Sequence, residues 1–114
     1  MIDKKFIGHE FAPVTAEVEK GRLRFFAKAT ANADPVYSGE AAARKAGYRA
    51  LPAPPTFLFC LEMDRDNPFD FLELLKIDLG KVLHGEQNFA YHAPVVASDR
   101  TTYRSKTADI YDHK

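Results

Sequence analysis

The 114-residue chain has no tryptophan, one cysteine and no surplus of charge of either sign. The single cysteine, Cys60, excludes an internal disulfide bond and fits a reducing compartment. Lys and Arg number 16, as do Asp and Glu, so the formal net charge is +0 and nucleic-acid binding is not expected. Because a chain without net charge does not repel its copies, we expect a dimer or a larger assembly.

Long hydrophobic runs are also missing. No stretch approaches the roughly 20 apolar residues of a membrane span, and residues 1–9 lack the apolar core of a signal peptide. We therefore expect a cytoplasmic protein without membrane contact. His84 and His92 have no cysteine or second histidine close by, so neither a metal site nor a cofactor is expected.

The hydrophobic pattern that is present predicts a single α+β domain over residues 1–114. Strands are expected over residues 13–18, 82–91 and 100–111, and helices over residues 19–31, 38–46, 55–63 and 71–75. Ser38 is expected to cap its helix and Gly47 to end it in a left-handed conformation. The helix over 55–63 is apolar on almost every side, which is typical of a buried helix with an antiparallel sheet wrapped around it.

Three segments together resemble a known family. They are residues 26–37, which include Asn32-Ala-Asp-Pro-Val-Tyr37, residues 42–57, which include Ala53-Pro-Pro-Thr-Phe57, and residues 83–94. In order and spacing they resemble the MaoC-like dehydratase N-terminal family, which includes substrate-binding subunits of (R)-3-hydroxyacyl thioester dehydratases. The resemblance implies a hot-dog fold, paired with a second such unit. Its last two strands would be missing here or supplied by a partner.

The family's catalytic motif is degenerate in this chain. Catalytic members carry Asp, any residue, Asn, Pro, an aliphatic residue and His, since removing water needs a base and an acid. Here Asn32 replaces the Asp and Tyr37 replaces the His. Asn is no base, and Tyr, with a pKa near ~10, is a poor one. Pro54 and Pro55 also stand where catalytic members have a His-Gly pair that offers a backbone amide. No catalytic residue is therefore expected.

Other polar residues have simpler explanations. Asp34 is interpreted as a turn residue that binds the backbone locally. Gln87 shares a predicted strand face with Leu83, Phe89 and Tyr91, and is interpreted as a buried hydrogen-bonding residue before a ligand contact. His84 and His92 are interpreted as structural, Cys60 as a buried thiol, and His9 and His113 as exposed.

The sequence thus predicts an acyl-thioester-binding subunit or half-domain of an (R)-specific 3-hydroxyacyl dehydratase or enoyl hydratase, with catalysis by a partner. The ligand would be an acyl-CoA or acyl-carrier-protein thioester, and the partner a catalytic hot-dog subunit or a second copy. The substrate-binding candidates are Asn32, Tyr37, Thr56, Phe57, Gln87 and Phe89. Two alternatives stay open. One is a self-sufficient homodimeric hydratase or thioesterase using residues such as Asp34 or Glu86, and the other is a non-enzymatic acyl-ligand-binding or dimerisation module.

Overall fold

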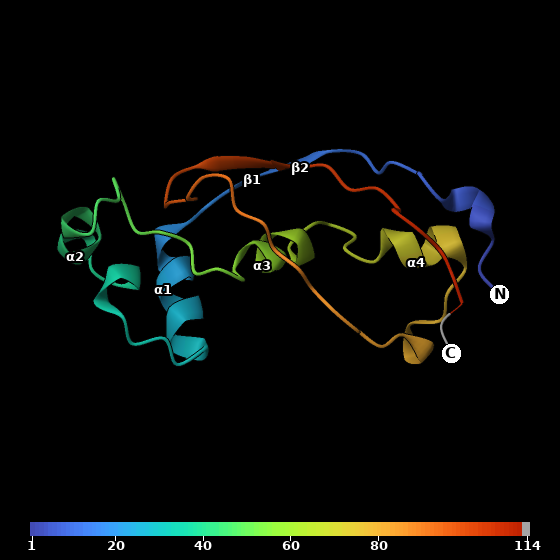
Figure 1. The fold of residues 1–114 in the computed structure, drawn as a ribbon, viewed down its shortest axis with the longest axis horizontal. Helices are drawn as coiled ribbons and strands as arrows, with labels where there is room; N and C mark the ends of the chain where they lie inside the picture. The colour runs from blue at the N-terminus through green and yellow to red at the C-terminus, as the bar shows by residue number, and fades with distance from the viewer. Residues whose placement is uncertain (113–114) are drawn as a thin grey trace.

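A two-stranded antiparallel sheet joins the two ends of the chain. A computed structural model describes residues 1–112, so His113 lies outside the described residues. Strand β1 (Val14–Glu17) pairs with β2 (Arg100–Tyr103) in a register that sets Val14 opposite Tyr103 (Figure 1). The strands predicted over 13–18 and 100–111 are therefore confirmed, although both are shorter than expected.

Backbone hydrogen bonds continue the pairing of these two segments, called the ribbon below, beyond both strands. The Gly8 amide donates to the Thr107 carbonyl at 2.7 Å, and the Val18 amide donates to the Asp99 carbonyl at 2.8 Å. The Asp99 carboxylate accepts the Val96 amide at 3.0 Å and the Arg49 guanidinium at 2.7 Å. These two contacts, the amide first, hold the pKa of Asp99 below its usual value. Asp99 therefore fixes the turn that leads into β2.

Most of the helices lie in the chain between the two strands. They are α1 (Lys20–Ala29), α2 (Glu40–Lys45), α3 (Leu58–Met63) and α4 (Asp70–Leu75), with the short 3-10 helices η2 (Pro35–Tyr37) and η3 (Leu79–Lys81). Another 3-10 helix, η1 (Lys4–Phe6), precedes β1. The four predicted helices are confirmed within a few residues. Gly47 follows α2 with φ +99°, as expected, because an L side chain rarely adopts that conformation. The prediction for Ser38 was wrong: Gly39 is the N-cap of α2, and Ser38 contacts the Pro35 carbonyl instead.

The core lies where α1 and α3 meet the inner side of the ribbon. Its buried members are Val18, Leu23, Ala43, Leu51, Phe57, Leu61 and Ala97. Phe57 packs edge-on against Phe26 of α1 with ring centres 5.5 Å apart, and the Arg22 guanidinium lies over the Phe57 ring, 5.8 Å from its centre. Arg22 also forms an ion pair with Asp64 just after α3. One aromatic ring therefore ties α1 to α3.

Helix α3 is less buried than its sequence predicts. Phe57 and Leu61 are buried, but Phe59 is 37% exposed and Cys60 is only half-buried. The prediction of a helix buried on all sides, and of a buried structural thiol, was therefore wrong for residues 1–112. One side of α3 faces the core, and the other faces a hollow that is described below.

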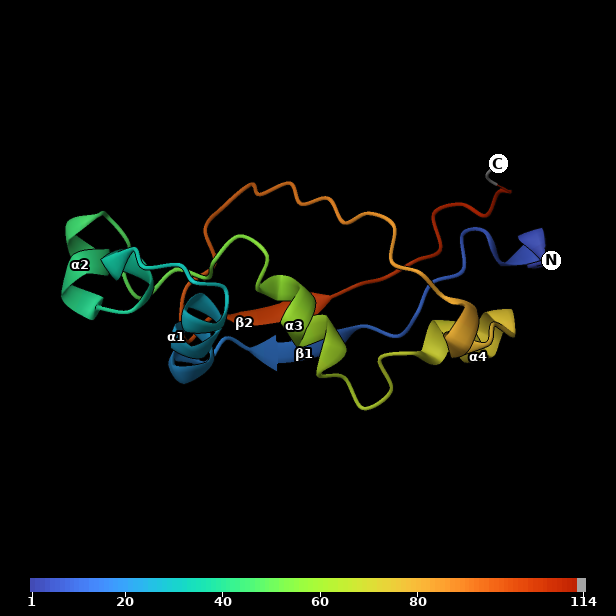
Figure 2. The ribbon, with the colours of Figure 1, turned by 90° about the horizontal axis from the view of Figure 1, so that it is seen from below.

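The strand predicted over 82–91 is absent from the described residues. This segment is extended but has no strand partner (Figure 2). Every residue from 83 to 91 is exposed, Leu83 by 94%. A strand forms only where a second backbone satisfies its amide and carbonyl groups, and no backbone hydrogen bond links residues 83–91 to the rest of residues 1–112. Gln87 is consequently exposed rather than buried, as are His84 and His92.

The molecule is elongated. It measures 52 × 26 × 24 Å and its radius of gyration is 16.9 Å. A compact domain of this length has a radius of gyration of about 13 Å. Figure 1 shows why: α2 lies at one end, α4 and η3 lie towards the other, and the ribbon spans the distance between them.

Candidate functional site

The main candidate site is an apolar cavity of about 520 Å³ beside α3. Its walls come from Phe26 of α1, from the start of α3 and from the exposed segment 83–91. The lining residues are Phe26, Thr56, Phe59, Cys60, His84, Gln87 and Phe89. Cavities of this size and apolar character are typical of sites for small organic ligands.

His84 and Gln87 supply the polar edge of this cavity. The His84 Nε2 and Gln87 Oε1 atoms are 3.3 Å apart, within hydrogen-bond distance, and the His84 ring meets Phe59 edge-on at 5.9 Å. Both side chains are exposed, as are Phe59 and Phe89 of the same lining. The cavity is therefore an open, mainly apolar hollow whose lining includes one imidazole and one amide.

The lining carries part of the chemistry that a dehydration requires. Elimination of water needs a base for the proton beside the carbonyl and an acid for the departing hydroxyl. The seven lining residues include an imidazole and a thiol, but no carboxyl group. Glu86, the neighbouring carboxylate, accepts a hydrogen bond from Asn88 at 2.8 Å and is not part of the lining. The arrangement suits binding of an apolar chain better than acid–base chemistry.

A second, smaller cavity has a volume of about 160 Å³. It is lined by Tyr37, Tyr48, Pro52, Ala53, Pro55, Tyr91, Pro94 and Val95. The Tyr91 hydroxyl donates a hydrogen bond to the Pro55 carbonyl, and partial burial raises the pKa of Tyr91, which keeps that hydroxyl protonated. This cavity contains Tyr37, the position that holds His in catalytic members of the family that the sequence resembles.

The loop before η2 makes local contacts. The Asp34 carboxylate accepts the Val36 amide at 3.0 Å and caps η2, which confirms its interpretation as a turn residue. The Asn32 side-chain oxygen accepts the Asp34 amide at 3.3 Å. Asn32 lines a third hollow of about 320 Å³, together with Arg24 and Lys28 of α1. Asn32 and Tyr37 therefore lie on different cavities, although the motif places them five residues apart.

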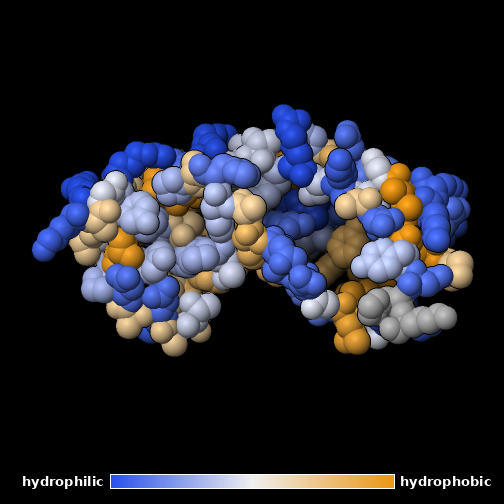
Figure 3. All heavy atoms as spheres, viewed as in Figure 1, coloured by the Kyte–Doolittle hydropathy of each residue, from blue (hydrophilic) through white to orange (hydrophobic). Residues whose placement is uncertain are grey.

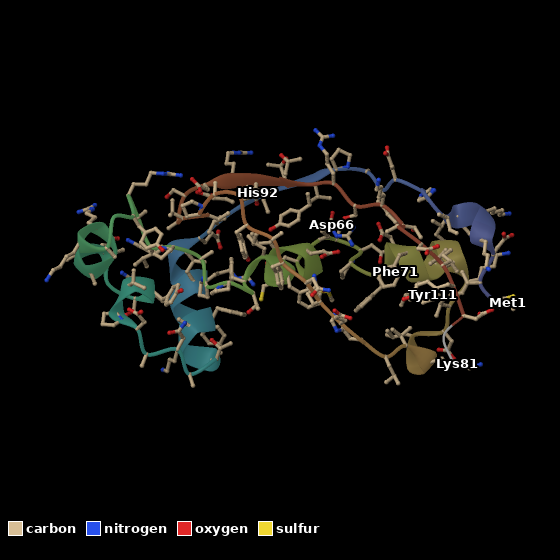
Figure 4. All side chains as sticks on the ribbon, viewed as in Figure 1. Met1, Asp66, Phe71, Lys81, His92 and Tyr111 are labelled. Atoms are coloured by element: carbon tan, nitrogen blue, oxygen red, sulfur yellow. The ribbon has the colours of Figure 1, made fainter. Side chains whose placement is uncertain are left out.

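Three of the six substrate-binding candidates meet at one site. Thr56, Gln87 and Phe89 line the apolar cavity, Phe57 is a core residue with 1% exposure, and Asn32 and Tyr37 lie elsewhere. Whether any of them binds substrate stays a prediction. Phe26, Cys60 and His84 also line the cavity and were not predicted to do so. Of these three residues, only His84 could have been found from the sequence, because it stands three residues before Gln87. His92 is exposed and lies outside the cavity lining (Figure 4).

Comparison with known proteins identifies the family. The family model described as FAS1-like, dehydratase domain region matches residues 5–114. The chain belongs to this family. A UPF0336 protein of Streptomyces avermitilis is 36% identical over 110 residues, which cover 96% of this chain and 73% of the relative. A UPF0336 protein of Saccharopolyspora erythraea is 39% identical over 100 residues, which cover 87% of this chain and 64% of the relative. The chain thus spans about two thirds to three quarters of their lengths.

A solved structure relates this FAS1-like dehydratase domain to an enzyme complex. One chain of the C-terminally truncated HadBC (3R-hydroxyacyl-ACP dehydratase) complex from Mycobacterium tuberculosis matches it with a TM-score of 0.75 and 30% identity. The match covers 87% of this chain and 73% of that chain. The resemblance to the MaoC-like dehydratases is thereby confirmed, and the domain is an α+β relative of the hot-dog dehydratases.

Two further findings concern the described residues only. Within residues 1–112, no helix is both long enough and apolar enough to cross a bilayer. In the same range, His, Cys, Asp and Glu side chains form no group of three or more that could hold a metal ion.

Proposed function

We propose that this chain is the acyl-thioester-binding subunit or half of an (R)-specific 3-hydroxyacyl dehydratase, and that the apolar cavity holds the acyl chain. The observation that carries this proposal is the 520 Å³ cavity itself, whose lining is mainly apolar and includes the rings of Phe26, Phe59 and Phe89. The family and the HadBC relative support the choice of an acyl thioester as ligand.

Catalysis would come from a partner. Asn32 and Tyr37 occupy the positions of the catalytic Asp and His, and they line separate hollows. The imidazole of His84 lies on the cavity without a carboxyl group in the lining. Asp34, one residue considered for an independent activity, is engaged in capping η2. These features favour a binding role over a self-sufficient hydratase or thioesterase.

The exposed segment 83–91 supports pairing with a second hot-dog unit. Its backbone makes no hydrogen bond to the rest of residues 1–112, and it runs apart from both strands (Figure 2). Its Leu83, Phe89 and Tyr91 side chains are exposed. Unpaired extended backbone beside apolar side chains is a template for another chain. Figure 3 shows apolar surface gathered on the part of the molecule that carries α4 and η3. The solved HadBC relative is itself a complex.

Blocking the cavity tests the proposal. Thr56 lies exposed on the cavity wall, so Thr56→Trp should fill part of the cavity without disturbing the core. We expect this variant to bind octanoyl-CoA at least tenfold more weakly than the wild type in calorimetry. Thr102→Trp, which changes an exposed β2 residue outside the cavity, is the matched control and should bind like the wild type. Equal binding by all three proteins would contradict the assignment of the cavity as the site of the acyl chain.

A further inference from the structure

Residues 83–91 form one wall of the 520 Å³ apolar cavity. His84, Gln87 and Phe89 line it from this segment, and the remaining lining residues come from α1 and from residues 56–60. We call residues 83–91 the strap, because this segment is extended and lines the cavity without belonging to a helix or strand. A chain bound in the cavity therefore contacts the strap on one side and the helices on the other.

The strap has few contacts with the rest of the molecule. Its backbone makes no hydrogen bond to the rest of residues 1–112, and every one of its residues is exposed. Two of its side chains attach it: the His84 ring meets Phe59 edge-on at 5.9 Å, and the Tyr91 hydroxyl donates to the Pro55 carbonyl. Segments with little burial and exposed backbone are ordered by only a small free energy. The strap is therefore the wall that a bound ligand has to order.

Gly85 adds to the freedom of the strap. A Cβ atom added to Gly85 would meet no other group within 4 Å, and its φ lies outside the left-handed region. Glycine has more backbone freedom to lose than any other residue. An alanine at this position therefore fits the observed conformation and restricts the strap when nothing is bound to it.

The sequence of the strap is complementary to itself. An antiparallel pair of straps centred on Gln87 places Gly85 opposite Phe89 of a second copy and Glu86 opposite Asn88 of that copy. An aromatic ring packs well over a glycine on the neighbouring strand, and no like charges meet in this register. The unpaired amide and carbonyl groups of each strap would then be satisfied by the other. The strap thus fits a second copy of this chain.

We propose that an acyl ligand in the cavity promotes the pairing of two copies of this chain along the strap. The inference rests on the proposed function, because the ligand is the acyl chain assigned to the cavity. The chain packs between Phe89 of the strap and Phe26 of α1 and holds the strap in place. An ordered strap loses less conformational entropy when a second copy pairs with it. By thermodynamic linkage, pairing strengthens acyl binding by the same factor.

Self-association measured with and without an acyl ligand tests this coupling. A dilution series of the purified chain in the analytical ultracentrifuge gives the dissociation constant of the dimer. We expect saturating octanoyl-CoA to lower this constant at least about fivefold. Coenzyme A without an acyl chain leaves the cavity empty, so it should leave the constant unchanged.

Gly85→Ala tests whether ordering of the strap carries the coupling. The variant has less freedom to lose, so it should strengthen both octanoyl-CoA binding and self-association about two- to fivefold. Gly21→Ala is the matched control, because a Cβ at Gly21 also meets nothing within 4 Å, and Gly21 lies in α1 outside the cavity lining. It should change neither constant.

The outcomes separate this inference from the proposed function. Octanoyl-CoA that binds but leaves self-association unchanged or weaker would overturn the coupling, as would copies that do not associate under either condition. A Gly85→Ala variant that binds octanoyl-CoA no more tightly than Gly21→Ala would also overturn it. In each of these cases the acyl cavity stands. If the wild type does not bind octanoyl-CoA, the proposed function falls, and this inference falls with it.

Discussion

Affinity for acyl-CoA is expected to rise by up to about fourfold with each added methylene until the apolar cavity is full. Burial of one methylene group stabilises a complex by about 0.8 kcal/mol, so four of them amount to about 200-fold. The cavity of about 520 Å³ offers Phe26, Phe59 and Phe89 as the surfaces that replace water around the chain. Calorimetry across saturated acyl-CoA thioesters of increasing length measures the slope directly.

Thr56→Trp provides the internal control for this series. Because Thr56 lies on the cavity wall, the larger ring should shorten the longest chain that still gains affinity. The affinity for short chains should change less. A flat response over the whole series in the wild type would show that the cavity does not hold the acyl chain, and would leave a role in assembly.

Replacing Phe57 with Ala is expected to cost about 3–5 kcal/mol of unfolding free energy. Phe57 is 1% exposed, and its ring contacts both Phe26 and the Arg22 guanidinium, so its removal leaves a cavity between α1 and α3. Phe25→Ala is the matched control, because Phe25 is 73% exposed and should change the free energy by less than about 0.5 kcal/mol. Urea unfolding followed by circular dichroism measures both. Similar losses for the two variants would show that Phe57 is not the packing centre.

The elements fixed by local patterns were predicted well. The alternation of residues 13–18 and the amphipathic pattern of residues 19–31 depend on neighbours within the chain, and β1 and α1 appear where these patterns place them. The alternation of residues 82–91 is just as regular, but an isolated extended segment leaves its backbone unpaired. A strand needs a partner, and the pattern of one segment carries no information about where that partner is.

Only part of the candidate site was predicted, because the site also depends on contacts between distant parts of the chain. Thr56, Gln87 and Phe89 were selected, and the fold brings residues about 30 positions apart onto one cavity. Asn32 and Tyr37 were grouped with them because catalytic relatives use those positions together. In this chain, Asp34 caps η2 and turns the loop, and the two side chains face different hollows. Local turn chemistry, rather than motif spacing, decides where they point.

The equal numbers of acidic and basic residues concealed an uneven distribution. The overall charge of +0 describes the chain as a whole, whereas the stretch with α1 and α2 is basic and the stretch with α4 is acidic. Figure 1 places these stretches towards opposite ends of the molecule. Association with an anionic carrier therefore does not require a net positive charge.

The most direct test of a binding role without catalysis is the hydration of crotonyl-CoA by the purified chain, with binding of the same ligand measured in the same sample. We expect binding, and loss of the enoyl absorbance no faster than in a protein-free control. In the proposed role Asn32 and Tyr37 stand in place of the catalytic Asp and His, and the cavity lining holds no carboxyl group. Turnover that survives further purification would contradict this role, and its loss in a His84→Gln variant would identify His84 as the catalytic group.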